Sequence, residues 1–418
     1  MLSMSSRPLR AAVVLLGAVA LAATTAAGPA AAGSVVAGSA SRAGHAVLTW
    51  YDATAAAIAA GGATTQVTNS RTWAIAWLAA ARAQTGSSSP VYRRAALAGA
   101  VHESLVALVP TQAAAVDAVL EADLAALPDG KAKDRGLAAG RAAADRLIEE
   151  RTGDGLDSAS VNAAFPVPPP APGVWQPTPS AYAAATQYGN RLARPFLLRG
   201  AAQFRPAPPP ALGSARYEAD LAEVRTYGAA GSTARTQAQT DTATFWLGSS
   251  FVLYTPVLRA AVEQSPTSTL SRTRLVALFH VALVDTQIAT SEAKYHYQTW
   301  RPVTAIRNAA VNPDPSWLPL HNTPAHPDFP SGHNTYSGAA EQILTVLFGP
   351  RARQPYTIPS PSAPGVTRTY TDWHLPSLEN IDARVWSGIH TRSADEAGIR
   401  LGRDVATNTL TRAHELLR

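Results

Sequence analysis

Residues 326–341 read HPDFPSGHNTYSGAAE, an extended, proline-broken run followed by a predicted helix. Two histidines, His326 and His333, flank Pro-Ser-Gly where the run becomes the helix. The start of a helix has unpaired backbone N–H groups and a partial positive charge, and therefore suits an anion. Serine is also a common helix cap, so Ser331 can be an ordinary N-cap with Gly332 merely tolerated. This stretch alone leaves both interpretations open.

Two further segments carry basic residues that would complete an anion site. In KYHYQTWRP, Lys294 and Arg301 are seven residues apart, or two helical turns, so we expect both side chains on one helix face. In RVWSGIH, Arg384 precedes His390 by six residues, which does not return to the same helix face. We therefore expect Gly388 to end or loosen the helix, so that His390 turns toward Arg384.

The basic residues Lys294, Arg301 and Arg384, with the N–H groups near Ser331, would form a cage for a tetrahedral oxyanion. A guanidinium matches such oxygens bidentately, and a lysine adds a point charge. Two histidines then suit two roles, in which one attacks or ligates the central atom and the other moves protons. A lone Lys–Arg pair is usually only solvated, but three segments in this order favour the cage.

Histidines are concentrated in one part of the chain, since seven of the ten lie between positions 280 and 390. The sequence has no H-E-x-x-H motif, and no Asp/His spacing there is typical of a zinc or two-metal site. The chain has no cysteine, which excludes thiolate ligands and cysteine nucleophiles. The pattern therefore favours oxyanion chemistry over a metal held by several protein ligands.

Three segments carry a resemblance to a known superfamily. K-x6-R-P at 294–302, P-S-G-H at 330–333 and R-x5-H at 384–390 resemble the ordered signature segments of the vanadium-dependent haloperoxidase and type-2 phosphatidic acid phosphatase (PAP2) superfamily. The surrounding residues, over roughly 240–415, resemble its bacterial haloperoxidase-like branch. The resemblance implies an all-α fold, a helical bundle of the vanadium haloperoxidase/PAP2 type with additional N-terminal helices.

The resemblance also implies which residues bind the oxyanion. Lys294, Arg301 and Arg384 would bind the oxygens of vanadate or phosphate. Ser331 and Gly332 would add a hydroxyl group and a backbone N–H.

Three further residues would carry the chemistry in this resemblance. His390 would be the covalent ligand of vanadium or, in a phosphatase, the nucleophile that forms a phospho-histidine. His333 would be the acid–base group. We expect Asp395 to be the partner that fixes the tautomer of His390, although it follows five residues later and not the usual four.

The sequence departs from the family pattern around the expected pocket. Ser291 stands where a fungal-type chloroperoxidase is expected to carry Trp, and Ser249 where an aspartate is expected after the Phe-Trp pair 245–246. His326 replaces the Phe of chloroperoxidases, as in the algal bromoperoxidases. Trp300 can either wall the site or be a core aromatic residue. Loss of a buried acid alters the pKa of the site histidines, which favours bromide oxidation or phosphoryl chemistry over chloride oxidation.

Three functions remain open. The first is a haloperoxidase that requires vanadate and oxidises a halide with hydrogen peroxide. The second is an acid phosphatase that acts on a phosphate ester in the same site without a cofactor, because vanadate mimics the geometry of phosphoryl transfer. The third is a non-catalytic helical scaffold with a decayed site, which the retention of every cage residue disfavours. The branch resemblance favours the first.

Residues 1–32 have the pattern of a secretory signal peptide, with Arg7 and Arg10 before an apolar run and small residues up to Ala32. We therefore expect a secreted protein. The apolar run is too short to span a bilayer, so we expect no stable membrane insertion. The formal net charge of +6 falls to +4 without the two leader arginines, which is too low to predict nucleic-acid binding. The oligomeric state is left undetermined.

Composition divides the rest of the chain into an N-terminal helical region at 33–164, a proline-rich linker or loops at 165–213, and a catalytic region at 214–418. Alanine and leucine recur at helical spacing, and no convincing strand pattern is present. The predicted helices are 70–84, 91–109, 111–127, 133–153, 214–228, 236–247, 269–300, 331–348, 378–389 and 393–416.

Overall fold

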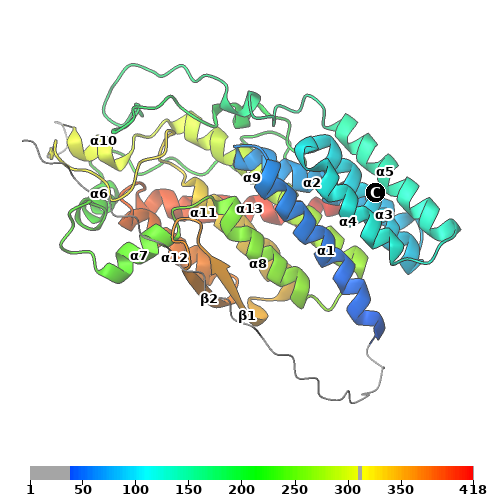
Figure 1. Cartoon of the computed structure of the whole chain (residues 1–418). Coiled ribbons are helices and arrows are strands. Elements are labelled where there is room, and N and C mark those ends of the chain that lie inside the picture. Colours follow the sequence, from blue (N-terminus) through cyan, green and yellow to red (C-terminus); the bar gives the residue numbers. More distant parts are fainter. Residues whose placement is uncertain (1–37, 309–312, 418) are drawn as a thin grey trace, which may run out of the picture. The chain divides into compact units, whose positions relative to one another are not determined.

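The computed structural model describes residues 38–308 and 313–417, with side chains from residue 46 onward. The predicted signal peptide, residues 1–32, lies outside the described residues. Within them the chain forms thirteen α-helices and one two-stranded antiparallel sheet, which confirms the prediction of a mostly helical fold (Figure 1).

The helices and strands form two groups along the chain. The N-terminal helices are α1 (Gly38–Gly61), α2 (Gln66–Ala83), α3 (Pro90–Leu108), α4 (Ala113–Ala125) and α5 (Lys131–Glu150). The later helices are α6 (Ala215–Tyr227), α7 (Gln237–Phe245), α8 (Ser250–Gln264), α9 (Thr269–Tyr297), α10 (Pro302–Arg307), α11 (Gly332–Phe348), α12 (Leu375–Trp386) and α13 (Arg392–Leu416). The strands are β1 (Arg351–Pro359) and β2 (Thr367–Asp372).

Helix α9 lies at the centre of the fold. Its residues from Leu275 to Tyr295 are all buried, as expected for a helix that is covered on every side. Helix α2 packs against it, and so do α11 and α13, which also pack against each other. The N-terminal and C-terminal helices therefore share one core, and the residues from Ser39 onward form a single compact unit.

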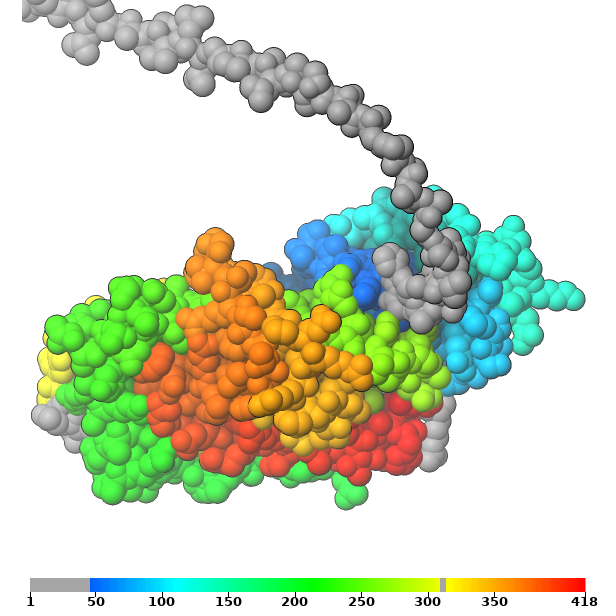
Figure 2. Space-filling model, turned by 90° about the horizontal axis from the view of Figure 1, so that it is seen from below, coloured from blue at the N-terminus to red at the C-terminus, as the bar shows by residue number. Residues whose placement is uncertain are grey.

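Helices α1 and α8 lie side by side, and the blue and yellow-green segments border each other in Figure 2. The Arg259 guanidinium donates to both carboxylate oxygens of Asp52, at 2.7 and 2.9 Å. The hydroxyl of the fully buried Tyr51 donates to the carbonyl of Thr255 at 2.7 Å. These contacts fix the start of the chain onto the later helices.

The proline-rich residues 165–213 contain no α-helix or β-strand and pack within the same unit. The N–H of the fully buried Trp175 donates to the carbonyl of Gln298 at 2.7 Å. The N–H of Trp300 donates to the carbonyl of Gly173 at 2.9 Å. This stretch is therefore held against the residues that follow α9.

The structure contains elements that the sequence pattern did not predict. Helices α1, α8 and α10 were not expected, and α8 contains Pro256, which is unfavourable inside a helix. The hairpin of β1 and β2 was also not expected, because only Tyr356 and Ile358 of β1 are buried and the rest of the strand shows little apolar alternation. The all-α prediction therefore omits one small surface sheet.

In the described part of the chain, no single helix is long and apolar enough to cross a membrane. Two sharply bent helix pairs, α3 with residues 110–125 and α7 with α8, meet that test together by length and composition only.

Candidate active site

The three motif segments converge at the ends of five helices. Lys294 lies in the last turn of α9, Arg301 directly precedes α10, and Ser331 directly precedes α11. Arg384 lies in the last turn of α12, and His390 in the short segment before α13. Each of these five residues is at most 2% exposed. Lys294, Arg301, Arg384 and the start of α11 are called the basic cage below.

Arg301 does not share a helix face with Lys294, so this prediction was wrong. Helix α9 ends at Tyr297 because Gln298 adopts a left-handed conformation with φ of +50°, and the backbone at Arg301 is extended. The two side chains converge on the same run of carbonyl groups instead. Arg301 Nε donates to the carbonyl of His326 at 2.7 Å, and Lys294 Nζ to that of Pro327 at 2.6 Å.

Gly388 changes the chain direction after α12, as predicted, but His390 then contacts Arg301, where the sequence suggested Arg384. It follows the end of α12 with φ of +79°, and a Cβ atom there would lie 2.3 Å from the carbonyl oxygen of Gly228. Only glycine fits both the conformation and the close approach. The turn directs His390 to Arg301, whose Nη1 lies 3.1 Å from His390 Nε2.

The partner of His390 is Asp328, not Asp395 as the sequence suggested. His390 Nδ1 lies 2.6 Å from Asp328 Oδ1, while Asp328 Oδ2 accepts from the hydroxyl of Thr391 at 2.8 Å. We assign the proton to Nδ1, since a carboxylate requires a donor and Arg301 donates to Nε2. Burial raises the pKa of Asp328 to about 6, against the opposing charges of Arg301 and Lys294. His390 thus presents Nε2 as its lone-pair nitrogen.

Asp395 supports the start of α11. Its Oδ1 accepts from Asn334 Nδ2 at 2.7 Å, and hydrogen bonds from Ser331 and Asn334 oppose the burial that raises its pKa well above the usual range. Asp328 stands in the quoted stretch only two residues after His326, so it was visible in the sequence. It was missed because the family pattern places the acidic partner after the histidine.

His326 is buried and His333 is partly buried beside the basic cage, and both are neutral at neutral pH. Burial and the charge of Arg384 lower the pKa of His333 to about 3, and its Nε2 donates to the carbonyl of Gly248 at 2.9 Å. This tautomer leaves Nδ1 as the basic nitrogen. The pKa of His326 is lowered well below its usual value by burial and by Lys294, and its Nδ1 accepts from Arg301 Nη2 at 3.0 Å.

The start of α11 is open and lacks a side-chain cap. The Ser331 side chain does not cap the first-turn N–H groups, so the interpretation of Ser331 as an ordinary N-cap is wrong. A Cβ atom built on Gly332 would find no neighbour nearer than 3.9 Å, the distance to Lys294 Cε. A methyl-sized space therefore lies between the helix start and the lysine.

The basic cage fits a bound oxyanion. Burial is the main cause that lowers the pKa of Lys294, Arg301 and Arg384, the two arginines to about 10. Arg384 Nη1 donates to the carbonyl of Trp246 at 3.1 Å, but its buried Nε has no partner in the described part of the chain. Buried donors without acceptors are costly, and an oxyanion supplies both acceptors and negative charge. Vanadate and phosphate both match this donor set.

A pocket of about 420 Å³ opens above the basic cage. His326, Gly332, His333 and His390 line its base. Its walls carry mainly amide and hydroxyl side chains from the N-terminal part of the chain and from Ser249, including Thr64, Thr65, Gln66, Asn162, Thr186, Gln187 and Asn190. The N-terminal helical region therefore helps to form the site.

Two predicted pocket residues do not line this pocket. Ser291 donates its hydroxyl to the carbonyl of Gln187 at 2.7 Å and so holds a wall segment in place. Trp300 packs in a separate apolar cluster, where its Nε1 donates to the hydroxyl of Tyr217 at 3.2 Å. Of the predicted pocket residues, only His326 lines it directly.

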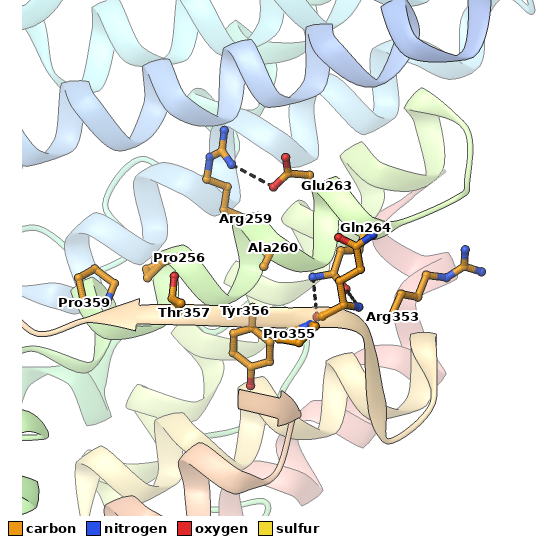
Figure 3. A pocket seen from close by; sticks show the side chains of 11 residues that line it. Pro256, Arg259, Ala260, Glu263, Gln264, Arg353, Pro355, Tyr356, Thr357 and Pro359 are labelled. Atoms are coloured by element: carbon orange, nitrogen blue, oxygen red, sulfur yellow. Dashed lines mark hydrogen bonds and ion pairs between the residues drawn. The ribbon is translucent and has the colours of Figure 1, made fainter. Parts of the chain in front are cut away.

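A larger cavity of about 820 Å³ lies between α8 and β1 (Figure 3). No residue of the three motifs lines it, and its Arg259 pairs with Glu263 at 3.2 Å. Volume alone therefore does not identify the site, whereas the unpaired Nε of Arg384 and the uncapped start of α11 do.

One family model and one known protein match part of this chain. Residues 274–418 match the family model described as the VCPO second helical-bundle domain. The vanadium chloroperoxidase of Curvularia inaequalis is 29% identical over 186 residues, which cover 33% of this chain and 30% of that protein. The matched region thus spans less than a third of the length of the fungal enzyme.

Solved structures extend the similarity to most of the chain. The first bacterial vanadium-dependent iodoperoxidase has a TM-score of 0.71 at 22% identity, covering 88% of this chain and 96% of its own. An apo-type bacterial vanadium-dependent chloroperoxidase has a TM-score of 0.65 at 16% identity, covering 84% and 95%. The shared fold includes the N-terminal helices.

Proposed function

We propose that this chain, which belongs to the superfamily of vanadium haloperoxidases and type-2 phosphatidic acid phosphatases, is a vanadate-dependent haloperoxidase. The observation that carries the proposal is the basic cage, in which three buried cations surround an open helix start and a carboxylate-directed histidine. When bound, vanadate supplies a Lewis-acidic centre at which hydrogen peroxide is activated to oxidise a halide.

The residues of the cage have separable tasks in this proposal. Lys294, Arg301 and Arg384 neutralise the oxyanion, and the free Nε of Arg384 offers a donor that the protein itself does not use. The backbone N–H groups at Gly332 add donors at the positive end of α11. Asp328 holds the His390 ring so that Nε2 faces the cage as a ligand atom.

His333 is suited to moving protons at the edge of the cage. Its Nε2–H is engaged by the carbonyl of Gly248, so proton transfer falls to Nδ1. Burial and Arg384 lower the pKa of the ring to about 3, so the ring is neutral, and the negative charge of an oxyanion in the cage would raise this pKa and let Nδ1 accept a proton. The protonated ring is positively charged, and burial and the charge of Arg384 disfavour it, so the proton is readily returned.

We propose bromide as a better substrate than chloride. Ser249 occupies the pocket position at which the chloroperoxidase pattern has an aspartate. Its hydroxyl donates to the side-chain oxygen of Gln66 at 3.2 Å. This position therefore offers the pocket a hydroxyl group where the chloroperoxidase pattern has a carboxylate, and the site histidines lack the effect of that carboxylate on their pKa.

The second candidate is a phosphatase in which His390 attacks phosphorus. The specific observation in its favour is the pocket of about 420 Å³, which has room for an organic phosphate above the cage. The basic cage serves both reactions, because vanadate and the transferred phosphoryl group present similar oxygens.

One experiment separates the two candidates. The phosphate-free protein is loaded with orthovanadate, and bromination of a dimedone reporter is followed with hydrogen peroxide and bromide, chloride or iodide. We expect bromination that requires vanadate, is lost in His390→Ala and persists in His296→Ala, an exposed histidine on α9. Hydrolysis of p-nitrophenyl phosphate that depends on His390 and is inhibited by vanadate, without bromination, would establish the phosphatase instead.

Our proposal includes export from the cell, which rests on the signal-peptide pattern of residues 1–32. Expression of the full chain in a bacterial host and N-terminal sequencing of the extracellular protein test it. A mature N-terminus near Ala32 is expected, whereas an intact leader on protein retained in the cell would contradict it.

A further inference from the structure

A second cavity of about 320 Å³ lies behind the catalytic histidine and shares no lining residue with the active-site pocket. Asp328 and Thr391, which hold each other beside His390, form part of its wall. The remaining wall comes from α6, from the residues after α9, and from the proline-rich stretch 208–212. None of the proposed catalytic steps uses this cavity.

Four aromatic side chains line the cavity, and hydrogen bonds fix three of them. The hydroxyl of Tyr217 accepts from Trp300 Nε1 at 3.2 Å. Tyr297 donates its hydroxyl to the carbonyl of Pro206 at 2.6 Å and packs edge-on against Phe329, with ring centroids 5.7 Å apart. The proline-rich stretch is therefore anchored as a wall of the cavity. Rigid rings of this kind form a preorganised apolar surface.

The cavity is also negatively charged. Asp220 and Asp328 line it, are 4% and 1% exposed, and no lysine, arginine or histidine is among its lining residues. Arg216 approaches Asp220 from outside the cavity at 3.1 Å, but its side chain is half exposed. Burial raises the pKa of Asp220 in spite of hydrogen bonds from the side chain and backbone of Ser393 and in spite of this ion pair. Among the described residues, the one countercharge of Asp220 is thus a half-exposed arginine that water screens, and no cationic side chain lines the cavity itself.

Aromatic rings combined with a buried carboxylate are the chemistry that recognises alkylated ammonium ions. Such an ion has apolar methyl groups, which suit the rings and prolines, and a diffuse charge, which suits Asp220. The volume lies at the lower end of the roughly 300–1,000 Å³ typical of small-molecule pockets. A neutral apolar ligand would fill the same space but would bring no positive charge to the carboxylate from inside the cavity.

We propose that this second cavity binds a small organic ammonium ion, with the cationic head beside Asp220 and its alkyl groups against Tyr217, Trp300 and the proline-rich stretch. The proposal is independent of the haloperoxidase assignment, because no residue of the basic cage lines the cavity. It also gives a role to the proline-rich stretch, which the proposed reaction leaves unused.

Calorimetric titration with choline and with 3,3-dimethyl-1-butanol, its neutral isostere, tests the proposal at constant ionic strength. We expect choline to bind one to one and the neutral alcohol to bind at least about tenfold more weakly, a difference of about 1.4 kcal/mol. The absence of choline binding, or equal binding of the two compounds, would overturn the proposal.

Two variants locate the site. Asp220→Asn is expected to weaken choline binding about tenfold or more, whereas Asp404→Asn, which changes an exposed carboxylate of α13, leaves it unchanged. Leu212→Trp places a larger side chain at a cavity-lining residue that is 48% exposed, so folding is preserved. It is expected to abolish binding, and Leu192→Trp, at an exposed residue outside the cavity, is its control. Unchanged choline affinity in Leu212→Trp would refute the site even if Asp220→Asn did not fold.

Discussion

Two buried histidines, His390 and His280, differ in the groups that contact their imidazole rings. His390 lies 2.6 Å from Asp328 and 3.1 Å from an Arg301 nitrogen. His280, on α9, has no hydrogen-bond partner for either ring nitrogen within the described chain, and stacks on Trp73 at a centroid distance of 4.7 Å. Burial lowers the pKa of both rings.

The difference shows that a lowered pKa does not by itself identify a catalytic histidine. Burial alone lowers the pKa of His280 to about 3, and the ring has no partner to select a tautomer. At His390 the charges of Arg301, Lys294 and Arg384 add to burial, while Asp328 directs the ring. The directed tautomer distinguishes the candidate active-site histidine from a core residue.

Removal of the directing partner should have the largest effect. Asp328→Asn keeps the shape of the side chain but allows the wrong tautomer of His390, so we expect vanadate-dependent bromination to fall about 10–100-fold. Asp395→Asn, which changes a buried carboxylate that does not contact His390, should retain more activity. Turnover and vanadate affinity of both variants provide the measurement, and an equal loss in the two would contradict the assignment of Asp328.

Much of the fold could be read from the sequence because long amphipathic helices repeat their apolar residues. The ten predicted helices all occur, with ends shifted by a few residues. The main error concerned Arg301, because the sequence gives no sign that Gln298 adopts a left-handed conformation and ends α9. Helices such as α8 were missed because an internal proline argues against a helix that tertiary packing nevertheless stabilises.

The basic cage was predictable because its residues lie in ordered motifs, whereas its partners were not. Asp328 contacts His390 across 62 residues of sequence, and Gly248 contacts His333 across 85. Such pairs depend on how helix ends meet in space, which local patterns do not specify. Trp300 illustrates the converse, since it adjoins a motif arginine in sequence but packs in a separate cluster.

His280, a buried histidine without a hydrogen-bond partner in the described chain, should affect how stability depends on pH but should not affect activity. Because the folded pKa of His280 is about 3, below the unfolded value of 6.5, the unfolded state binds the proton first as the pH falls. Its contribution to stability is therefore lost between about pH 6.5 and pH 3. At pH 5 this amounts to about 2 kcal/mol.

Urea unfolding of the wild type and His280→Phe at pH 7 and pH 5 measures this contribution. We expect the free energy of unfolding of the variant, relative to the wild type, to rise by about 2 kcal/mol between pH 7 and pH 5. Bromination at pH 7 should change little, in contrast to Asp328→Asn. A stability difference that is independent of pH would show that His280 is protonated or hydrogen-bonded in the folded protein.

Two glycines of α11 differ in the space around them, because Gly332 adjoins the open helix start and Gly338 lies against α13. A Cβ atom at Gly332 would meet nothing within 3.9 Å, whereas one at Gly338 would lie 2.3 Å from the carbonyl of Ile399. Gly332→Ala should therefore leave the melting temperature unchanged or raised and weaken vanadate binding about tenfold, or about 1.4 kcal/mol. Gly338→Ala should instead lower the melting temperature, because α11 and α13 must separate.

Vanadate titration and thermal unfolding of both variants distinguish these effects. Unaltered vanadate affinity in a folded Gly332→Ala protein would show that the anion does not approach the start of α11. A destabilised Gly332→Ala protein would show that the apparent space is filled in the folded chain.

The smallest expected effect lies one step outward from the cage, at Ser291. Its hydroxyl donates to the carbonyl of Gln187, so Ser291→Ala removes one hydrogen bond to a wall segment and leaves the cage untouched. We expect a loss of about 1 kcal/mol in the local stability of residues 186–192 and no change in vanadate affinity. Hydrogen exchange of peptides covering this segment should therefore quicken by about fivefold, as 1.4 kcal/mol corresponds to tenfold. Ser271→Ala, at an exposed serine near the start of α9, should leave that exchange unchanged. Weakened vanadate binding in Ser291→Ala would mean that the pocket wall and the basic cage form one cooperative unit. It would contradict the view that the cage is held in place independently of the wall.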